Sequence, residues 1–267
     1  MRPSVLAKTL RDARRPFLWW SAGLAAYVAM IVAVYPTIRD NDELGRLVEQ
    51  YPEALKAFIA FGGELDFTSA TGYLGGELFS FMIPALLLVV AVGGGAGAIA
   101  GEEERGTLDL LLATPVPRRR VAAEKLTAVC LELVGLGAVL WASLWLGGRL
   151  VSMGIPAGDL AGATASAVLL AIAYGAIAFL LGAGTGRKAA AIGISIAAAV
   201  AAFLVSSLAS IVGALEPLRA ISPFHHYAAG DPLTNGLQPW HALFLVGLGA
   251  AAAIVGIVLF DRRDVAA

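Results

Sequence analysis

Residues 78–100 read LFSFMIPALLLVVAVGGGAGAIA, without a charged side chain. A helix rises about 1.5 Å per residue, so roughly 20 apolar residues cross the hydrocarbon core of a bilayer, which is about 30 Å thick. Lipid offers no hydrogen-bond partner to an open backbone, so a stretch of this kind has to be helical. Residues 78–100 therefore predict a transmembrane helix.

Five further stretches meet the same criterion, at about residues 17–35, 126–146, 161–182, 189–208 and 242–260. With 58% hydrophobic and 15% charged residues, the chain has too little polar surface for a water-soluble domain. The first stretch is too long for a signal peptide and precedes no small-residue cleavage site, so we expect an uncleaved span. The predicted fold class is all-α, a polytopic membrane protein with about six transmembrane helices.

Basic residues are unevenly divided between the segments that flank these spans. Of the 19 lysines and arginines, 14 fall before span 1, between spans 2 and 3, between spans 4 and 5, and after span 6. Because basic segments stay in the cytoplasm, both termini are predicted there, in a multi-pass protein of the plasma membrane. We expect a cytoplasmic interfacial segment over 1–16, followed by a single transmembrane domain over 17–265.

Glycine and alanine are dense in the spans, as in Gly93-Gly94-Gly95-Ala96-Gly97. Small residues let helix backbones approach closely, so we expect tight packing against other helices, within this chain or in a second subunit. A nucleotide-binding loop is disfavoured because the run lies inside an apolar span and follows no strand.

Several functional classes are disfavoured by what the sequence lacks. No Gly-Lys-Ser/Thr sequence occurs, so ATP would have to bind another polypeptide. A formal net charge of -1 gives no reason to expect nucleic acid, and the single Cys130 excludes an intrachain disulfide. Three histidines and one cysteine supply no metal-ligand spacing, so we expect no metal and no cofactor on this chain.

Between spans 2 and 3, residues 101–125 read GEEERGTLDLLLATPVPRRRVAAEK, a sharp polar interruption. The acids Glu102–Glu104 suit the positive end of a new helix. Leu108, Leu111 and Leu112 follow at i, i+3 and i+4, which gives a short helix one apolar face. Pro115 and Pro117 would end it.

The same segment closes with basic residues. Arg118, Arg119 and Arg120 would lie near anionic lipid headgroups, with Lys125 marking the beginning of span 3. The expected result is an amphipathic helix at the cytoplasmic face of the membrane. The residues alone leave open whether it lies on lipid or docks to a partner protein.

The run Glu104-Arg105-Gly106-Thr107-Leu108, continued by Leu111-Leu112, Pro115-Val116, Arg118 and Lys125, resembles the signature of type 2 ABC exporter permeases. In that family this segment contains the coupling helix, which fits a groove on the ATPase. The resemblance implies a permease without enzymatic activity of its own, a second permease chain, and two ABC ATPase subunits that hold ATP and Mg. The implied coupling residues are Glu102, Glu103, Glu104, Arg105, Gly106, Thr107, Leu108, Leu111, Leu112 and Pro115.

The resemblance extends over most of the chain. Residues 2–15 are similar to the family's cytoplasmic interfacial helix, and 222–227 with 231–233 are similar to its last external loop. In the family this loop dips back into the membrane, which implies a re-entrant segment over 214–240 and an external gate. The implied gate residues are Pro223, Phe224, His225 and His226. From the residues alone, this mixture suits metal binding or pH sensing, although adjacent histidines without a third spaced ligand favour anchoring at the interface.

The predicted external loop over 36–77 is long for the family and acidic. Its apolar residues between Leu44 and Ile59 have helical spacing, so we expect helix here. A solvated surface is the simpler interpretation of its acids, and a vestibule that attracts cations is the alternative.

Glu132 is the one acid well inside an apolar span. An ionisable group at that depth is costly unless it is wetted or paired. It is a candidate for the translocation pathway, and a reach toward Lys125 or Arg187 is the structural alternative.

Two other functions remain open beside the exporter permease. One is an ATPase-coupled signalling or assembly scaffold that transports nothing. The other is an intramembrane enzyme that uses a serine from Ser195, Ser206 or Ser207 with His225 or His241, a pairing that no motif supports.

Overall fold

The computed structural model describes residues 4–39, 68–108, 116–209 and 212–263, and these residues form helices and no strands. Six helical stretches are long and apolar enough to cross a membrane, which confirms the predicted class. They are Val5–Arg39, Ala70–Glu104, Arg118–Leu150, Ala157–Thr185, Lys188–Leu208 and Pro239–Arg262. Each contains one predicted span.

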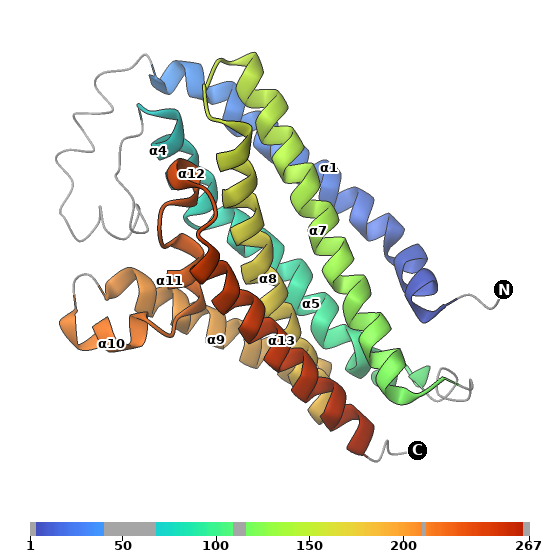
Figure 1. Ribbon diagram of the computed structural model, residues 1–267. Coiled ribbons are helices and arrows are strands. Elements are labelled where there is room, and N and C mark those ends of the chain that lie inside the picture. The colour runs from blue at the N-terminus through green and yellow to red at the C-terminus, as the bar shows by residue number, and fades with distance from the viewer. Residues whose placement is uncertain (1–3, 40–67, 109–115, 210–211, 264–267) are drawn as a thin grey trace.

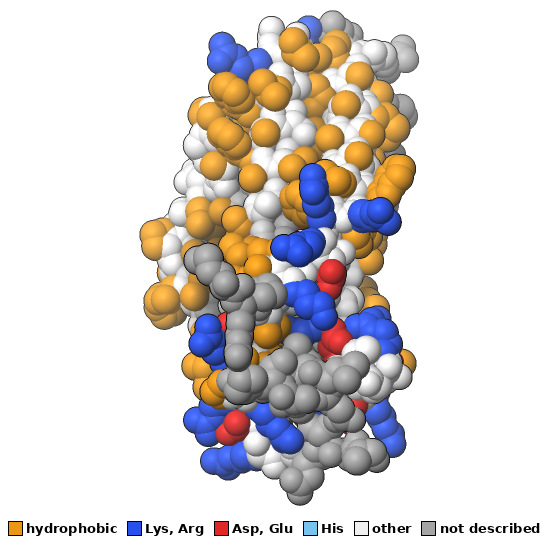
Figure 2. Space-filling view, turned by 90° about the vertical axis from the view of Figure 1, so that its right-hand side faces the viewer, with side chains coloured by type: hydrophobic (Ala, Val, Ile, Leu, Met, Phe, Trp, Pro, Cys, Tyr) orange, Lys and Arg blue, Asp and Glu red, His pale blue; other side chains and the backbone are white. Residues whose placement is uncertain are grey.

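The long helices run roughly along a common direction (Figure 1). They are α1 (Val5–Arg39), α5 (Met82–Glu104), α7 (Arg118–Leu150), α8 (Ala157–Thr185), α9 (Lys188–Leu208) and α13 (Pro239–Arg262). The beginning of α1, the end of α5, the beginning of α7 and the end of α13 lie at one end, which we call the terminal end. On the surface shown in Figure 2, most of the charged side chains lie in the lower half, toward this end, and the upper half is mostly hydrophobic.

Short helices gather at the opposite end of the bundle (Figure 1). They are α4 (Ala70–Leu74), the π-helical turn η1 (Gly75–Phe79), the 3-10 turn η2 (Gly213–Leu215), α10 (Glu216–Arg219), α11 (Pro223–Ala228) and α12 (Pro232–Asn235). The stretch predicted as re-entrant, 214–240, is therefore a series of short helices that ends in the first turn of α13. The helix predicted between Leu44 and Ile59 lies outside the described residues.

Two of the spanning helices are much longer than their apolar stretches. α1 has 35 residues and α7 has 33, which at about 1.5 Å per residue is about 50 Å and exceeds the hydrocarbon thickness. In α1 the helix continues through the polar residues 5–16. Pro16 lies within this helix and does not end it. The predicted interfacial segment is thus mostly the first part of α1.

α8 is the central helix and packs against α5, α7, α9 and α13. Its contact with α5 depends on glycine: a Cβ atom on Gly95 would overlap the carbonyl oxygen of Gly175, and one on Gly182 would lie 2.9 Å from the carbonyl oxygen of Ala96. Backbones approach this closely only without side chains between them. Within the glycine run, Gly95 therefore has the packing role that was predicted for the run as a whole.

Candidate functional site

Three consecutive acids at the end of α5 each bond a different helical segment. Glu102 accepts from Lys125 near the beginning of α7, and Glu103 accepts from Arg263 at the end of α13. Glu104 accepts from the backbone N–H of Lys188, the first residue of α9, at 2.8 Å. We call Glu102, Glu103 and Glu104 the acidic triplet; it joins the terminal ends of four helices.

The acidic triplet corrects one detail of the sequence interpretation. The acids do not begin a new helix, because α5 continues through Glu104. Carboxylates near a helix C-terminus face the negative end of the helix dipole, which disfavours them there. The cations Lys125 and Arg263, and the positive N-terminal end of α9, offset this effect.

The chain leaves α5 through a turn that Glu102 organises. Arg105 is exposed and lies 3.3 Å from the Glu102 carboxylate, and Gly106 has φ +66°, a conformation that favours glycine. The Thr107 hydroxyl donates to Glu102, and its backbone N–H donates to the Glu102 carbonyl at 2.9 Å. The Glu102 carboxylate therefore holds both the Lys125 side chain and the turn at 105–107.

Leu108 is 1% exposed and belongs to an apolar cluster at the terminal end. The other members of this cluster come from α5, α7, α8 and α13, and they include Ile99, Leu126, Phe179 and Phe260. Leu111, Leu112 and Pro115 lie outside the described residues, so the predicted leucine face stays a prediction.

The basic residues of 118–125 bond protein groups. Arg118 donates to the Arg263 carbonyl at 3.0 Å, Arg119 pairs with Asp261 at 2.7 Å, and Arg120 pairs with Glu124 at 2.8 Å. Arg119 and Arg120 are exposed as well, so their predicted role at lipid headgroups stays a prediction.

Lys125 differs from its predicted position at the membrane surface. Its side chain is 9% exposed and bonded to Glu102. A lysine ammonium is buried at such a site only because it is paired. Lys125 is therefore part of the ionic connection between α5 and α7.

Glu132 lies on α7 and is partly buried, beside the exposed apolar residues Leu131 and Val134. Lys125 is bonded to Glu102, and among the described residues no ion pair joins Glu132 to Lys125 or Arg187, so the alternative reach is not seen. Its role in a pathway stays a prediction.

At the opposite end, the predicted gate residues pack against the bundle. Phe224 is buried, with ring centroids 5.5 Å from Phe203 and 6.0 Å from Tyr174. The hydroxyl of Tyr227, on the same helix, donates to the Phe79 carbonyl at 2.6 Å. These contacts hold α11 against η1, α8 and α9.

All three histidines of the chain lie together here. The Nδ1 atoms of His226 and His241 are 2.9 Å apart, and His226 Nε2 is 2.9 Å from the Ala220 carbonyl oxygen. A carbonyl only accepts, so Nε2 carries a hydrogen, and in the neutral pair His241 donates to His226. Burial, together with the charges of Arg219 and the other two histidines, lowers the pKa of His225 to about 4. The described ranges contain no group of three or more His, Cys, Asp or Glu placed to hold a metal ion.

The sequence interpretation missed the partners that complete both groups. Arg263 entered the sequence analysis only as one of the basic residues after span 6, and Asp261 did not enter it. The charge balance places both on the same side of the membrane as 101–125, which is compatible with their pairing with Glu103 and Arg119. His241 lies 15 positions after His226, a spacing that corresponds to no regular contact.

Comparison with known families supports the resemblance. A family model described as "ABC-2 family transporter protein" matches residues 4–265, nearly the whole chain. A search of curated proteins found no match. The resemblance seen in residues 104–125 is thereby confirmed at the level of the family. On this evidence, the chain belongs to the ABC-2 family of transporter proteins.

Proposed function

We propose that this chain is the permease subunit of an ATP-driven exporter in the plasma membrane. In this proposal two permease chains, identical or similar, form the pathway, and two ABC ATPase subunits that bind ATP and Mg drive it through residues 101–125. Family membership supports the permease role and an ABC ATPase partner in general. The lack of a Gly-Lys-Ser/Thr sequence supports a nucleotide site on a separate subunit.

The burial of Leu108 carries the coupling part of this proposal. Leu108 lies within the segment expected to meet the ATPase, and it is buried in an apolar cluster whose other members come from four helices. A displacement of Leu108 therefore changes packing in all four, because closely packed interiors transmit strain.

The acidic triplet adds a second, ionic connection to the same helices. Glu102 bonds both Lys125 and Thr107, so the turn at 105–107 and the beginning of α7 share one carboxylate. A push on this turn would reach α7 through Glu102, α13 through Glu103 and α9 through Glu104.

Exposed apolar side chains on α9 and α13 support a membrane setting with room for a second chain. They include Ile194, Val200, Leu243 and Ile254, each 51–62% exposed. Lipid covers such side chains in a single chain, and a second permease would replace part of that lipid.

Cysteine labelling tests the orientation. The native Cys130 is first changed to alanine, and Arg105→Cys then places a thiol on an exposed position. An impermeant maleimide should label it in opened membranes and not in intact cells. Labelling in intact cells would overturn the cytoplasmic coupling role.

Leu108 variants test the coupling itself. In vesicles holding the permease with its ATPase, Leu108→Ala should leave the subunits associated and lower the amount transported per ATP hydrolysed. Leu108→Met conserves the side-chain volume and should keep most of the wild-type amount transported per ATP hydrolysed. Leu218→Ala, at a 46% exposed leucine of α10 at the other end, is the control and should resemble wild type.

The same vesicles separate export from scaffolding. Full transport per ATP in Leu108→Ala would contradict the coupling role. An intact, ATP-hydrolysing complex that moves none of a panel of drugs, lipids, peptides and sodium ions would favour the scaffold.

A further inference from the structure

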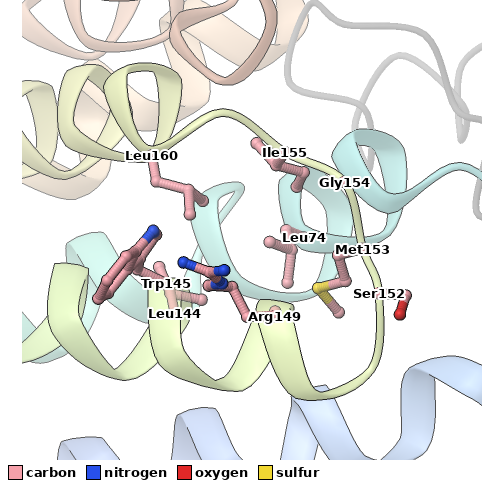
Figure 3. Close-up of a pocket in the computed structure, with 10 residues that line it drawn as sticks. Leu74, Leu144, Trp145, Arg149, Ser152, Met153, Gly154, Ile155 and Leu160 are labelled. Carbon is pink, nitrogen blue, oxygen red and sulfur yellow. The ribbon is translucent and has the colours of Figure 1, made fainter.

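A pocket of about 360 Å³ lies at the end of the bundle opposite the terminal end (Figure 3). Its wall is formed by the last turns of α7, the connection from α7 to α8, the beginning of α8, and α4. The lining residues are Leu74, Leu144, Trp145, Gly148, Arg149, Ser152, Met153, Gly154, Ile155 and Leu160. The pocket is remote from the acidic triplet and is separate from the three histidines.

The pocket wall is held by local structure. The Met153 backbone N–H donates to the Gly148 carbonyl at 2.9 Å, and Ser152 and Gly154 have φ +57° and +74°. These left-handed residues turn the chain back over the end of α7 and bury Met153. The indole N–H of Trp141 donates to the Ala157 carbonyl at 3.0 Å, which fixes α8 beside α7.

One cation, the exposed Arg149, lines this pocket among mostly apolar residues. Figure 3 shows the Arg149 guanidinium beside the Trp145 ring, with Leu160 above it, and its Cζ atom lies 5.4 Å from the Trp145 ring centroid. Trp145 is in turn stacked on Trp141, with centroids 5.8 Å apart and an interplanar angle of 4°. The tryptophan pair thus positions the guanidinium, and the lining contains no carboxylate that would neutralise it.

The positive charge of Arg149 and the position of the pocket at the ends of spanning helices together indicate which ligand it binds. Aromatic pairs at the ends of spanning helices mark the membrane interface, where headgroups lie. Arginine offers planar paired donors to a phosphate, and the leucines and Met153 suit the first part of an acyl chain. Beside the pocket, Leu146 and Leu150 are 56% and 86% exposed, so the apolar surface continues toward lipid.

We propose that this pocket binds an anionic phospholipid, with its phosphate on Arg149 and the glycerol end of an acyl chain against Leu74, Met153 and Leu160. The proposal does not depend on the direction of transport or on coupling to an ATPase. It assigns to the α7–α8 connection a lipid site that would hold this end of α7 against α4.

Lipid retention by the full-length chain tests this site. The purified protein is exchanged into detergent containing either phosphatidylglycerol or phosphatidylcholine, and bound lipid is counted by native mass spectrometry. Wild type should retain phosphatidylglycerol in preference. Arg149→Gln should weaken that retention about fivefold or more, the effect expected for one cation at a membrane surface.

Two further variants keep the test specific. Gly148→Leu fills the pocket, because a side chain there begins 3.7 Å from Met153, and it should lower retention of both lipids. Arg39→Gln removes another arginine that lies over an aromatic ring, 5.9 Å from the centroid of Tyr35, outside the pocket, and should have no effect.

Three outcomes would overturn the proposal. They are equal retention of the two lipids by wild type, unchanged phosphatidylglycerol retention in Arg149→Gln, and displacement of the lipid by millimolar inorganic phosphate. The last outcome would identify a free anion site. A melting temperature within a few degrees of wild type shows that each variant is folded.

Discussion

Lys125 on α7 donates its ammonium group to Glu102 in the last turn of α5, and both residues are largely buried. The pair joins two helices whose polar connection contains the turn at 105–107. Breaking it by removing one charge is costlier than losing an exposed ion pair, because the remaining charge stays away from water.

Lys125→Met should destabilise the protein by about 1 to 3 kcal/mol. The value falls below the 3 to 5 kcal/mol typical of a fully buried pair because Glu102 keeps Arg105 and Thr107 as partners. Thermal unfolding in detergent measures it, and the double variant with Glu102→Gln should cost less than the two single changes together. Arg120→Met is the control, because the Arg120 side chain is 67% exposed and Glu124 keeps the Leu6 N–H as a partner, so stability should change by no more than about 0.5 kcal/mol. Strict additivity would contradict the pairing.

Gly186→Ala should destabilise by more than Gly154→Ala. Both glycines have positive φ, +69° and +74°, so alanine costs about 1 to 2 kcal/mol at either. Only at Gly186 would the new methyl also lie 2.8 Å from the Glu103 carboxylate and from Arg263, which disturbs their ion pair. Comparing the two melting temperatures isolates this second effect, and equal losses would show that the ion pair is not disturbed.

Gly95→Ala should weaken the packing of α5 on α8 by about 1 to 3 kcal/mol, because the methyl group overlaps the Gly175 backbone. Gly93→Ala is a matched change two residues earlier, where a Cβ meets no described atom within 4 Å. There alanine should be neutral or stabilising by up to about 1 kcal/mol, since it favours helix. Similar effects at both positions would contradict the close approach.

Lowering the pH from 6.5 to 4 should destabilise the protein through His225. Its pKa is about 4 in the folded chain and about 6.5 when unfolded, so in this range the unfolded chain binds a proton that the folded chain does not. Carboxylates titrate over part of the same range, so the informative quantity is the difference between wild type and His225→Gln. The variant's melting temperature should fall less on acidification, and parallel pH profiles would refute the assignment.

The spans could be predicted from the sequence because each is a long apolar run that only a helix can bury in lipid. Residues 161–182 show this directly and lie inside α8, while 78–100 belong to η1 and α5 apart from the turn at Ser80 and Phe81. The ends were less predictable, because the helices continue through polar flanks such as 5–16 and 118–125 although the hydropathy changes there. The acids of 102–104 suited a helix beginning, and tertiary partners placed them at a helix end instead.

The partners within the candidate site depend on packing between distant segments. The charge balance placed 101–125 and the C-terminal end on one side of the membrane. It did not show that Glu103 meets Arg263 or that Arg119 meets Asp261, contacts more than 140 positions apart. The pocket around Arg149 depends on the left-handed backbone conformation of Ser152. Serine rarely adopts this conformation, so the sequence did not predict the turn or the pocket.

The glycine contact between α5 and α8 limits how this bundle can open. The carbonyl oxygens of Gly175 and Ala96 occupy the space that side chains would fill at Gly95 and Gly182. Sliding or rotating one helix past the other would therefore bring backbone atoms into collision. The two therefore have to travel as one body. The apolar windows of α9 and α1 are only 17% and 22% buried within the chain, so these two helices are held least by the rest of the bundle.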